Sequence, residues 1–256
     1  MSAPGSALKS TAGPLGETYP APAADPDAPP AEGAPLAAFY AWEEARVAAM
    51  REGRAGPFAY LWCPQLSLSV SRREARRLGV ETLGFDAEEI AVRATGGTAV
   101  PQGPGTLNLT LFTLHDAHPG IGDTYRVVCA ALAEAFGALG METTVGARAG
   151  SFCDGDYNLL WENRKLVGTA QRWANRRGGA GVIGHHHCAI LSGGEPDWLC
   201  SRTEALYAAA GLDVRYDRDA HSGRTVPAHE LGDALRGPVS GVLGCDSITT
   251  VSASTA

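Results

Sequence analysis

The chain lacks the features that mark several large classes of protein. Its 256 residues carry a formal net charge of −7, so there is no basic surplus for binding nucleic acid, and the arginine cluster over residues 72–77 is too small to supply one. No apolar run approaches the ~20 residues of a membrane span, and no charged start leads into an apolar segment. We therefore expect a soluble, cytoplasmic protein that binds neither nucleic acid nor membranes.

The cysteines and glycines also lack several familiar patterns. None of the six cysteines forms a C-x-x-C pair, which argues against a zinc ribbon and against a disulfide scaffold. No G-K-[ST] follows the Gly96-Gly97 pair, so it is not a Walker loop, and no G-x-S-x-G elbow indicates a hydrolase serine. The scattered cysteines are typical of a reducing compartment.

Composition divides the chain into three parts. Residues 1–34 are rich in Ala, Pro, Gly and Ser and nearly free of large apolar side chains, so we expect a disordered tail. Residues 35–246 can bury a sizeable core, because the chain is 45% hydrophobic and 19% charged. We expect residues 247–256 to form a second flexible tail.

Apolar periodicity predicts the secondary structure of the middle part. Helical spacing predicts helices over residues 35–52, 72–78, 123–139 and 197–210. Alternation of apolar and polar residues predicts strands over residues 58–63, 66–70, 89–93, 107–111, 143–147, 157–161, 165–173 and 181–191. Hairpins interleaved irregularly with helices predict an α+β fold, with a mixed, largely antiparallel sheet packed with helices.

One stretch, residues 151–170, combines a thiol with an amine. Cys153 lies in a loop of Gly and Asp residues, where a core cysteine would have apolar neighbours, and Lys165 opens a strand twelve residues later. Neighbouring carboxylates raise a thiol pKa, so a reactive Cys153 needs a nearby cation. In a simple hairpin about Asn163, Lys165 lies beside Trp161, so the cysteine loop must fold back for the two groups to meet. On this pattern alone, an unreactive loop cysteine and a solvated lysine remain open.

A second stretch, R-A-T-G-G-T-A-V at residues 93–100, follows a predicted strand. Adjacent glycines permit positive φ and a close approach of the backbone to a ligand. Arg93 offers a bidentate donor for a carboxylate or phosphate. An ordinary Gly-Gly turn is the alternative.

Three consecutive histidines, His185 to His187, invite a metal-site interpretation. Because side chains alternate along a strand, His185 and His187 share one face, and His186 and Cys188 share the other. Two ligands on one face without a nearby carboxylate pattern make a weak zinc site. We therefore predict structural or surface roles and no metal.

Together these stretches resemble the lipoate/biotin protein ligase and octanoyltransferase family, from about residue 36 to residue 216. The most specific matches are R-x-T-G-G-x-A-V at 93–100, L-N-L at 107–109 and R-K-L-V-G-T-A-Q-R at 164–172. The resemblance implies a biotin/lipoate protein ligase-like single catalytic domain in which Lys165 contacts an acyl carbonyl. It also implies a substrate-binding set made of Arg93, Thr95, Gly96, Gly97, Ala99, Asn108, Gly168, Thr169 and Ala170.

Within the family, G-S-F-C-x-G-x-Y-x-L at residues 150–159 resembles the cysteine loop of amidotransferases that move octanoyl from the glycine cleavage H protein. This implies a catalytic Cys153 that carries an octanoyl or lipoyl group as a thioester, without a cofactor. The acceptor is then a lysine of a lipoyl carrier domain, either the glycine cleavage H protein or a 2-oxoacid dehydrogenase acyltransferase subunit. The chain departs from the family at Asp154, where a proline or another small residue is usual, and at the three histidines.

Two alternatives use the same fold. One is a lipoate-protein ligase that consumes ATP with Mg and forms a lipoyl-adenylate; it would use Lys165 but not Cys153. The other is a non-catalytic carrier-binding protein in which Cys153 is incidental.

Overall fold

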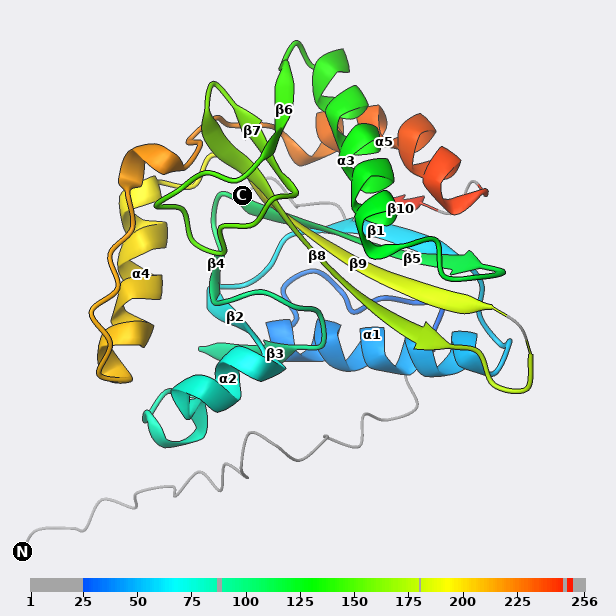
Figure 1. Ribbon diagram of the computed structural model, residues 1–256, viewed down its shortest axis with the longest axis horizontal. Helices are drawn as coiled ribbons and strands as arrows, with labels where there is room; N and C mark the ends of the chain where they lie inside the picture. Colours follow the sequence, from blue (N-terminus) through cyan, green and yellow to red (C-terminus); the bar gives the residue numbers. More distant parts are fainter. Residues whose placement is uncertain (1–24, 87–88, 180, 246–247, 251–256) are drawn as a thin grey trace, which may run out of the picture.

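The computed structural model describes residues 25–86, 89–179, 181–245 and 248–250. A seven-stranded sheet runs through its centre in the order β10-β1-β5-β9-β8-β7-β6 (Figure 1). Its strands are β1 Phe58–Trp62, β5 Thr106–His115, β6 Thr143–Gly146, β7 Asn158–Trp161, β8 Arg164–Asn175, β9 Val182–Leu191 and β10 Ile248–Thr250. A three-stranded sheet in the order β3-β2-β4 consists of β2 Ser67–Ser71, β3 Ile90–Arg93 and β4 Val100–Gln102.

The large sheet is antiparallel throughout except where β10 runs parallel to β1. In the small sheet, β2 runs parallel to β3 and antiparallel to β4. The predicted α+β fold with a mixed, largely antiparallel sheet is therefore confirmed.

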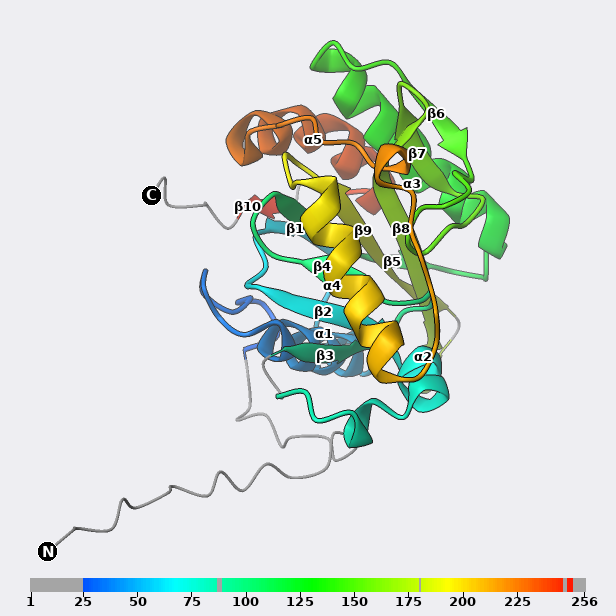
Figure 2. The same ribbon diagram turned by 90° about the vertical axis from the view of Figure 1, so that its left-hand side faces the viewer.

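Helices cover both faces of the large sheet. On one face lie α3 (Ile121–Ala138) and α5 (Ala228–Leu243), and on the other lies α1 (Leu36–Arg51) (Figure 1). The short helix α2 (Arg72–Leu78) and the helix α4 (Pro196–Ala209) pack on the small sheet (Figure 2). Single 3-10 turns, η1 (Val80–Thr82) and η2 (Arg218–Ala220), complete the described elements.

The alternation of β5 separates the two faces. Leu107, Leu109 and Leu111 enter the core beneath α3 and α5, as the sequence predicts. Asn108 and Thr110 point the other way, because successive side chains of a strand lie on opposite faces. The α1 side of the sheet thus holds buried polar groups that the functional site can use.

The hairpin between β7 and β8 was predicted, but its loop is one residue shorter than the turn expected over residues 162–164. Glu162 and Asn163 have φ of 50° and 58°, the left-handed pair of a two-residue hairpin loop. The two-residue loop places Arg164 opposite Trp161 and Lys165 opposite Leu160, so Lys165 does not lie beside Trp161 as a hairpin about Asn163 predicts. A register shift follows between Leu160 and Leu159.

Parts of the predicted tails are ordered. Residues 1–24 lie outside the described residues, but residues 25–34 pack onto α1 instead of forming a disordered tail. The Trp42 indole N–H donates to the Asp25 carbonyl at 3.0 Å, and the Arg46 guanidinium donates to the carbonyl of Pro26 and pairs with Asp27. These anchors hold the backbone of a segment that has little apolar surface of its own.

The prediction of a second flexible tail, over residues 247–256, also needs correction. Residues 248–250 form β10 beside β1, while residues 247 and 251–256 lie outside the described residues. The chain reaches β10 through α5, for which the sequence analysis made no prediction.

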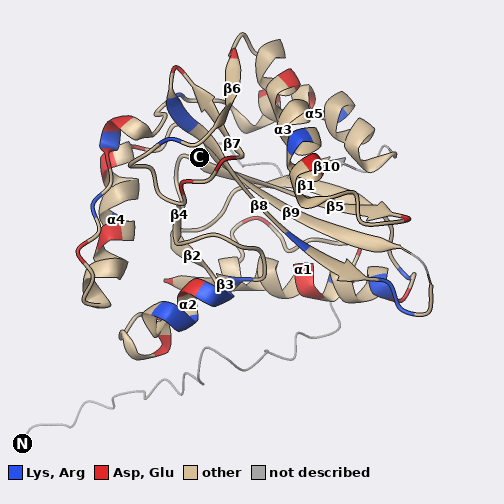
Figure 3. Cartoon of the chain, in the orientation of Figure 1, with Lys and Arg blue, Asp and Glu red and all other residues tan. Residues whose placement is uncertain are grey.

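The surface carries no concentrated basic face on the elements described. The four arginines of α2 are exposed and share that helix with Glu74, which pairs with Arg77 at 2.7 Å (Figure 3). None of the helices formed by the described residues has both the length and the apolar character that a membrane crossing requires.

Candidate active site

A pocket lies between the α1 side of the large sheet and the small sheet. It encloses about 490 Å³, its open mouth included. Its walls are Tyr40, Trp62, Ser69, Arg93, Val100, Gln102, Asn108, Phe152, Cys153, Lys165, Gly168, Thr169, Ala170, His187 and Ala189.

Both predicted catalytic residues and five of the predicted substrate-binding residues line this pocket, namely Cys153, Lys165, Arg93, Asn108, Gly168, Thr169 and Ala170. Four others do not line it: Thr95, Gly96, Gly97 and Ala99. They belong to the loop that joins β3 to β4, directly behind the pocket wall.

The cysteine loop folds back over the β7–β8 hairpin, as a meeting of the two groups requires. The Lys165 ammonium donates to the carbonyl oxygens of Phe152, at 2.7 Å, and Cys153, at 2.8 Å. The Phe152 N–H in turn donates to Nε2 of His221, a ring whose pKa burial lowers to about 4 and which is therefore a neutral acceptor. Lys165 thus ties the loop to the sheet from inside the protein.

Cys153 adopts an unusual backbone conformation. Its φ is 49°, in the left-handed region that costs a non-glycine residue about 1–2 kcal/mol. Such a conformation persists where the surroundings hold it, and the two hydrogen bonds from Lys165 to the Phe152 and Cys153 carbonyls do so. The backbone therefore holds the thiol in one place before any substrate arrives.

The surroundings of the thiol favour its thiolate form. Burial by itself raises the pKa of Cys153, but the charges of Lys165 and Arg93 and the Thr98 N–H outweigh burial, so the pKa lies below its ordinary value. The Thr98 N–H donates to Sγ at 3.4 Å. A lowered pKa makes more of the nucleophilic thiolate available at neutral pH.

Lys165 is suited to proton transfer. It is one of only two lysines in the chain, and its side chain is 2% exposed. Burial lowers its pKa to about 8, against the opposing charges of Cys153 and Asp154. An amine with a pKa near the working pH can both donate and accept a proton.

Two glycines make room for these groups. A Cβ on Gly97, where φ is 95°, would lie 2.6 Å from the Cys153 sulfur and 2.9 Å from the Arg93 guanidinium. A Cβ on Gly168 would lie 3.0 Å from Cε of Lys165. The close backbone approach that the Gly96-Gly97 pair predicts is thus an approach to the thiol, while Gly96 has open space around it.

Arg93 does not act as the predicted donor for a ligand carboxylate or phosphate. All five of its N–H groups are used within the protein, on Ser69, Gly96 and Thr98. It shapes the glycine loop and adds positive charge near the thiol. This role arises because the loop after β3 turns back onto the Arg93 side chain. The strand pattern of residues 89–93 does not indicate that turn.

The sequence analysis missed the other lining residues, which are Tyr40, Trp62, Ser69, Val100, Gln102, Phe152, His187 and Ala189. Strand alternation could have identified His187 and Ala189, which share one face of β9. Others depend on tertiary contacts, such as the hydrogen bond from the Asn108 amide to Oε1 of Gln102 at 2.6 Å.

Comparisons with a family model and with curated proteins point to the same family. The profile of the lipoyl protein ligase A/B catalytic domain matches residues 36–206. The chain is 35% identical over 190 residues to an uncharacterised protein of Cupriavidus necator, covering 67% of this chain and 73% of that one. It is also 35% identical over 173 residues to an octanoyl-[GcvH]:protein N-octanoyltransferase of Kyrpidia tusciae, covering 66% of this chain and 58% of the relative.

Solved structures agree on the fold. A lipoate-protein ligase A bound with ATP superposes with a TM-score of 0.61 at 18% identity, covering 84% of this chain and 83% of that one. A putative lipoate protein ligase from T. acidophilum gives a TM-score of 0.59 at 19% identity, covering 82% of each chain.

Proposed function

Because the chain belongs to the lipoyl protein ligase A/B catalytic domain family, we propose that it moves an octanoyl or lipoyl group onto a lysine of a lipoyl carrier domain through a thioester on Cys153. The observation that carries this proposal is the pairing of a thiol of lowered pKa with a buried lysine whose pKa is about 8. The name of the Kyrpidia relative supports the octanoyl group and the glycine cleavage H protein as donor.

In the first half-reaction, the Cys153 thiolate attacks the carbonyl carbon of an acyl-lysine amide on the donor domain. A carbon–sulfur bond forms, the carbon–nitrogen bond of the amide breaks, and the Lys165 ammonium gives a proton to the departing amine. The Thr98 N–H, which already points at Sγ, lies within reach of the oxyanion that forms beside it.

In the second half-reaction, the acceptor lysine attacks the thioester as a neutral amine. The new carbon–nitrogen bond replaces the carbon–sulfur bond, and the proton lost by the amine passes to neutral Lys165. The thiolate and the ammonium are then restored, so the two steps balance without ATP or another cofactor.

The pocket anchors the acyl chain but does not choose the protein partner. Burying about seven methylenes at ~0.8 kcal/mol each provides roughly 5–6 kcal/mol. We therefore expect selection of the lipoyl carrier domains to lie at the surface around the pocket mouth.

The test mixes the purified protein with an octanoylated carrier domain and an unmodified acceptor domain, without ATP, and follows intact masses. We expect an octanoyl adduct that maps to Cys153, followed by transfer to the acceptor. Cys63→Ser is the matched control, because Cys63 is also a partly buried free cysteine but does not line the pocket.

Two results contradict the proposal and separate its alternatives. If no adduct forms and the acceptor is modified only with free lipoate and Mg-ATP, the protein is a ligase. If the acceptor is modified under neither condition while the carrier domain binds, the protein is a non-catalytic carrier-binding protein.

A further inference from the structure

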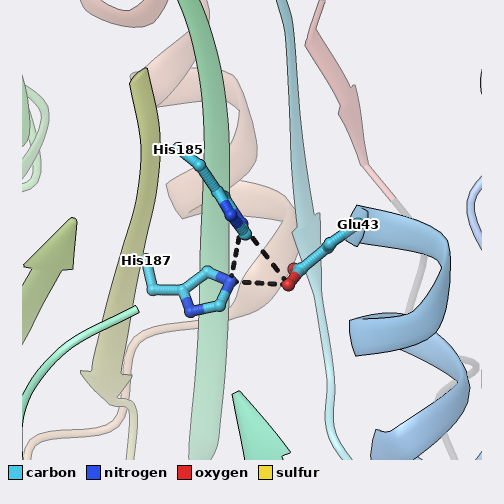
Figure 4. A group of neighbouring side chains, drawn as sticks. All are labelled: Glu43, His185 and His187. Atoms are coloured by element: carbon cyan, nitrogen blue, oxygen red, sulfur yellow. Dashed lines mark hydrogen bonds and ion pairs between the residues drawn. The ribbon is translucent and has the colours of Figure 1, made fainter. Parts of the chain in front are cut away.

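Two buried side chains and one partly buried side chain that lines the pocket converge at the pocket wall. Glu43 extends from α1, and His185 and His187 extend from β9 toward it (Figure 4). Oε2 of Glu43 lies 2.7 Å from Nε2 of His187 and 3.4 Å from Nε2 of His185, and the two Nε2 atoms are 3.0 Å apart. The carboxylate that the histidine pattern lacked is thus supplied from 144 residues before His187.

Two of these separations, 3.0 and 3.4 Å, match those of neighbouring ligands around one metal ion, whereas the 2.7 Å contact has the length of a charge-assisted hydrogen bond. Nitrogen and oxygen ligands bind zinc at about 2.0–2.2 Å, which places neighbouring ligand atoms about 3 Å apart at right angles and about 3.4 Å apart in a tetrahedron. The side chains of Glu43 and His185 are each 2% exposed and that of His187 is 12% exposed. The donor atoms are therefore fixed in place and shielded from bulk water.

The outer contacts aim the donor atoms inward. The Tyr60 hydroxyl, at 2.6 Å, and the Thr110 hydroxyl, at 3.1 Å, donate to Oε1 of Glu43 and leave Oε2 facing the histidines. Thr95 Oγ1 lies 2.8 Å from Nδ1 of His187, which leaves Nε2 facing Glu43. Metal-binding histidines and carboxylates are usually oriented by contacts of this kind.

Hydrogen bonds alone do not account for the close contact between the two histidine nitrogens. If both Nε2–H groups donate to the carboxylate, the 3.0 Å contact between the two nitrogens has no shared proton. Nδ1 of His185, on the outer side of a ring that stacks on Phe112, has no hydrogen-bond partner among the described residues, and an ion at Nε2 would not supply one. A cation at the centre would bind all three inward-facing lone pairs at once.

We propose that Glu43, His185 and His187 bind one divalent transition-metal ion. Two imidazoles and one carboxylate suit zinc, iron, nickel or copper, whereas magnesium and calcium prefer oxygen ligands alone. The ion would join α1 to β9 and, through His187 and Thr95, would brace the glycine loop that contacts Cys153. Metal binding at this site does not require the proposed acyl transfer, although His187 also lines the pocket, and it adds a metal that the histidine pattern did not predict.

The first measurement uses the full chain without a histidine tag, stripped with a chelator and titrated with Zn²⁺ in a calorimeter. We expect one equivalent to bind. X-ray absorption of the zinc-loaded protein should then show nitrogen and oxygen at about 2.0–2.1 Å and no sulfur at about 2.3 Å. Failure to bind one equivalent, or a sulfur shell that places the ion on cysteine, overturns the proposal without reliance on any variant.

Variants then locate the ion. His185→Phe keeps the ring that stacks on Phe112 and should weaken Zn²⁺ binding more than a hundredfold. Tyr60→Phe, which removes a contact to Glu43 but no ligand, should weaken it about tenfold to a hundredfold.

The matched control is His186→Phe, the same substitution one residue along, on the opposite face of β9, where the side chain contacts Thr113. It should leave Zn²⁺ affinity within about threefold of the parent chain. Equal affinity in His185→Phe and His186→Phe contradicts the proposed ligands. Circular dichroism and the melting temperature of each variant establish that the binding is measured on folded protein.

Discussion

In two regions of the molecule, the pKa values of buried thiols are shifted in opposite directions. In the core between the large sheet and α3, burial raises the pKa of Cys129 to about 12 and that of Cys188 higher still. At the pocket wall, burial pushes the pKa of Cys153 in the same direction, but Lys165 and Arg93 reverse the outcome. The comparison teaches that neighbouring positive charge, not removal from water, decides which cysteine has a lowered pKa.

The largest expected effect comes from removing the poised thiol itself. Cys153→Ser should lower transfer from the octanoylated donor to the acceptor domain by at least about 10³-fold, because a serine hydroxyl stays protonated where the thiol ionises. Initial rates of acceptor modification, measured by intact mass, provide the test. A loss of less than tenfold would mean that the acyl group does not pass through Cys153.

The second-largest effect should come from removing Lys165, which would raise the pKa of Cys153 toward the raised pKa values of the core cysteines. Lys165→Met removes the positive charge that lowers the pKa of Cys153 most, so this pKa should rise and alkylation of Cys153 by iodoacetamide should require higher pH. Transfer should fall by about 10²–10³-fold, because the same change removes the group that exchanges protons with the two amines. The pH profile of alkylation, followed by mass spectrometry on parent and variant chains, gives the direction of the shift.

Unchanged alkylation in Lys165→Met would show that Arg93 and the Thr98 N–H are sufficient to lower the pKa. Parent and variant must be compared as folded proteins, since methionine leaves the Phe152 and Cys153 carbonyls without their donor. Protection of the Cys153 loop from proteolysis is the control for that loss.

A smaller effect should follow from displacing the thiol without changing any charge. Gly97→Ala places a methyl group 2.6 Å from the sulfur, at a φ of 95° that alanine rarely adopts, so we expect transfer to fall about 10²-fold. Gly96→Ala is the matched control, because no atom lies within 4 Å of its added Cβ. Steady-state transfer rates of the two variants should therefore differ by more than tenfold, and similar rates would contradict the assigned role of Gly97.

Much of the fold was predictable because its signals are local. The helix predicted over residues 123–139 is α3 at 121–138, and the predicted hairpin forms, with a loop at Glu162 and Asn163 that is one residue shorter than expected. Cys153 and Lys165 were found for a related reason: they lie within one short stretch whose motif specifies the family. The family model, which matches residues 36–206, confirms the family, and the solved structure agrees on the fold, while the roles of Cys153 and Lys165 stay a prediction.

The features that were missed depend on contacts between distant segments. The cluster of Glu43 with His185 and His187 forms only when α1 packs on β9, and nothing near Glu43 in the sequence indicates it. Arg93 lines the pocket as predicted, but its donors are already bound to Ser69 and to the glycine loop, which the sequence does not indicate. In both cases residue type was informative, but the direction of the side chain came from tertiary packing.

The helix α5 escaped prediction for a different reason. Its buried stripe, Leu231, Leu235, Val239 and Leu243, repeats every fourth residue, yet Pro238 lies inside it. Proline normally breaks a helix interior at a cost of about 3 kcal/mol. This stripe packs into the core against the large sheet and so stabilises the helix. Helix propensities read from the sequence do not include that packing.

The smallest expected effect on transfer belongs to the core thiol. Cys188 is fully buried among apolar side chains, so Cys188→Ser places a hydroxyl there and should lower the free energy of unfolding by about 1–3 kcal/mol. The rate of transfer by the folded variant should stay within about twofold of the parent, because Cys188 does not line the pocket. Urea unfolding and transfer assays on the same preparation separate stability from activity. Cys188→Ala removes the sulfur without adding a polar group, so it separates the cost of burying a hydroxyl from the cost of lost packing. A large loss of transfer activity in either variant would mean that the two thiol regions are coupled.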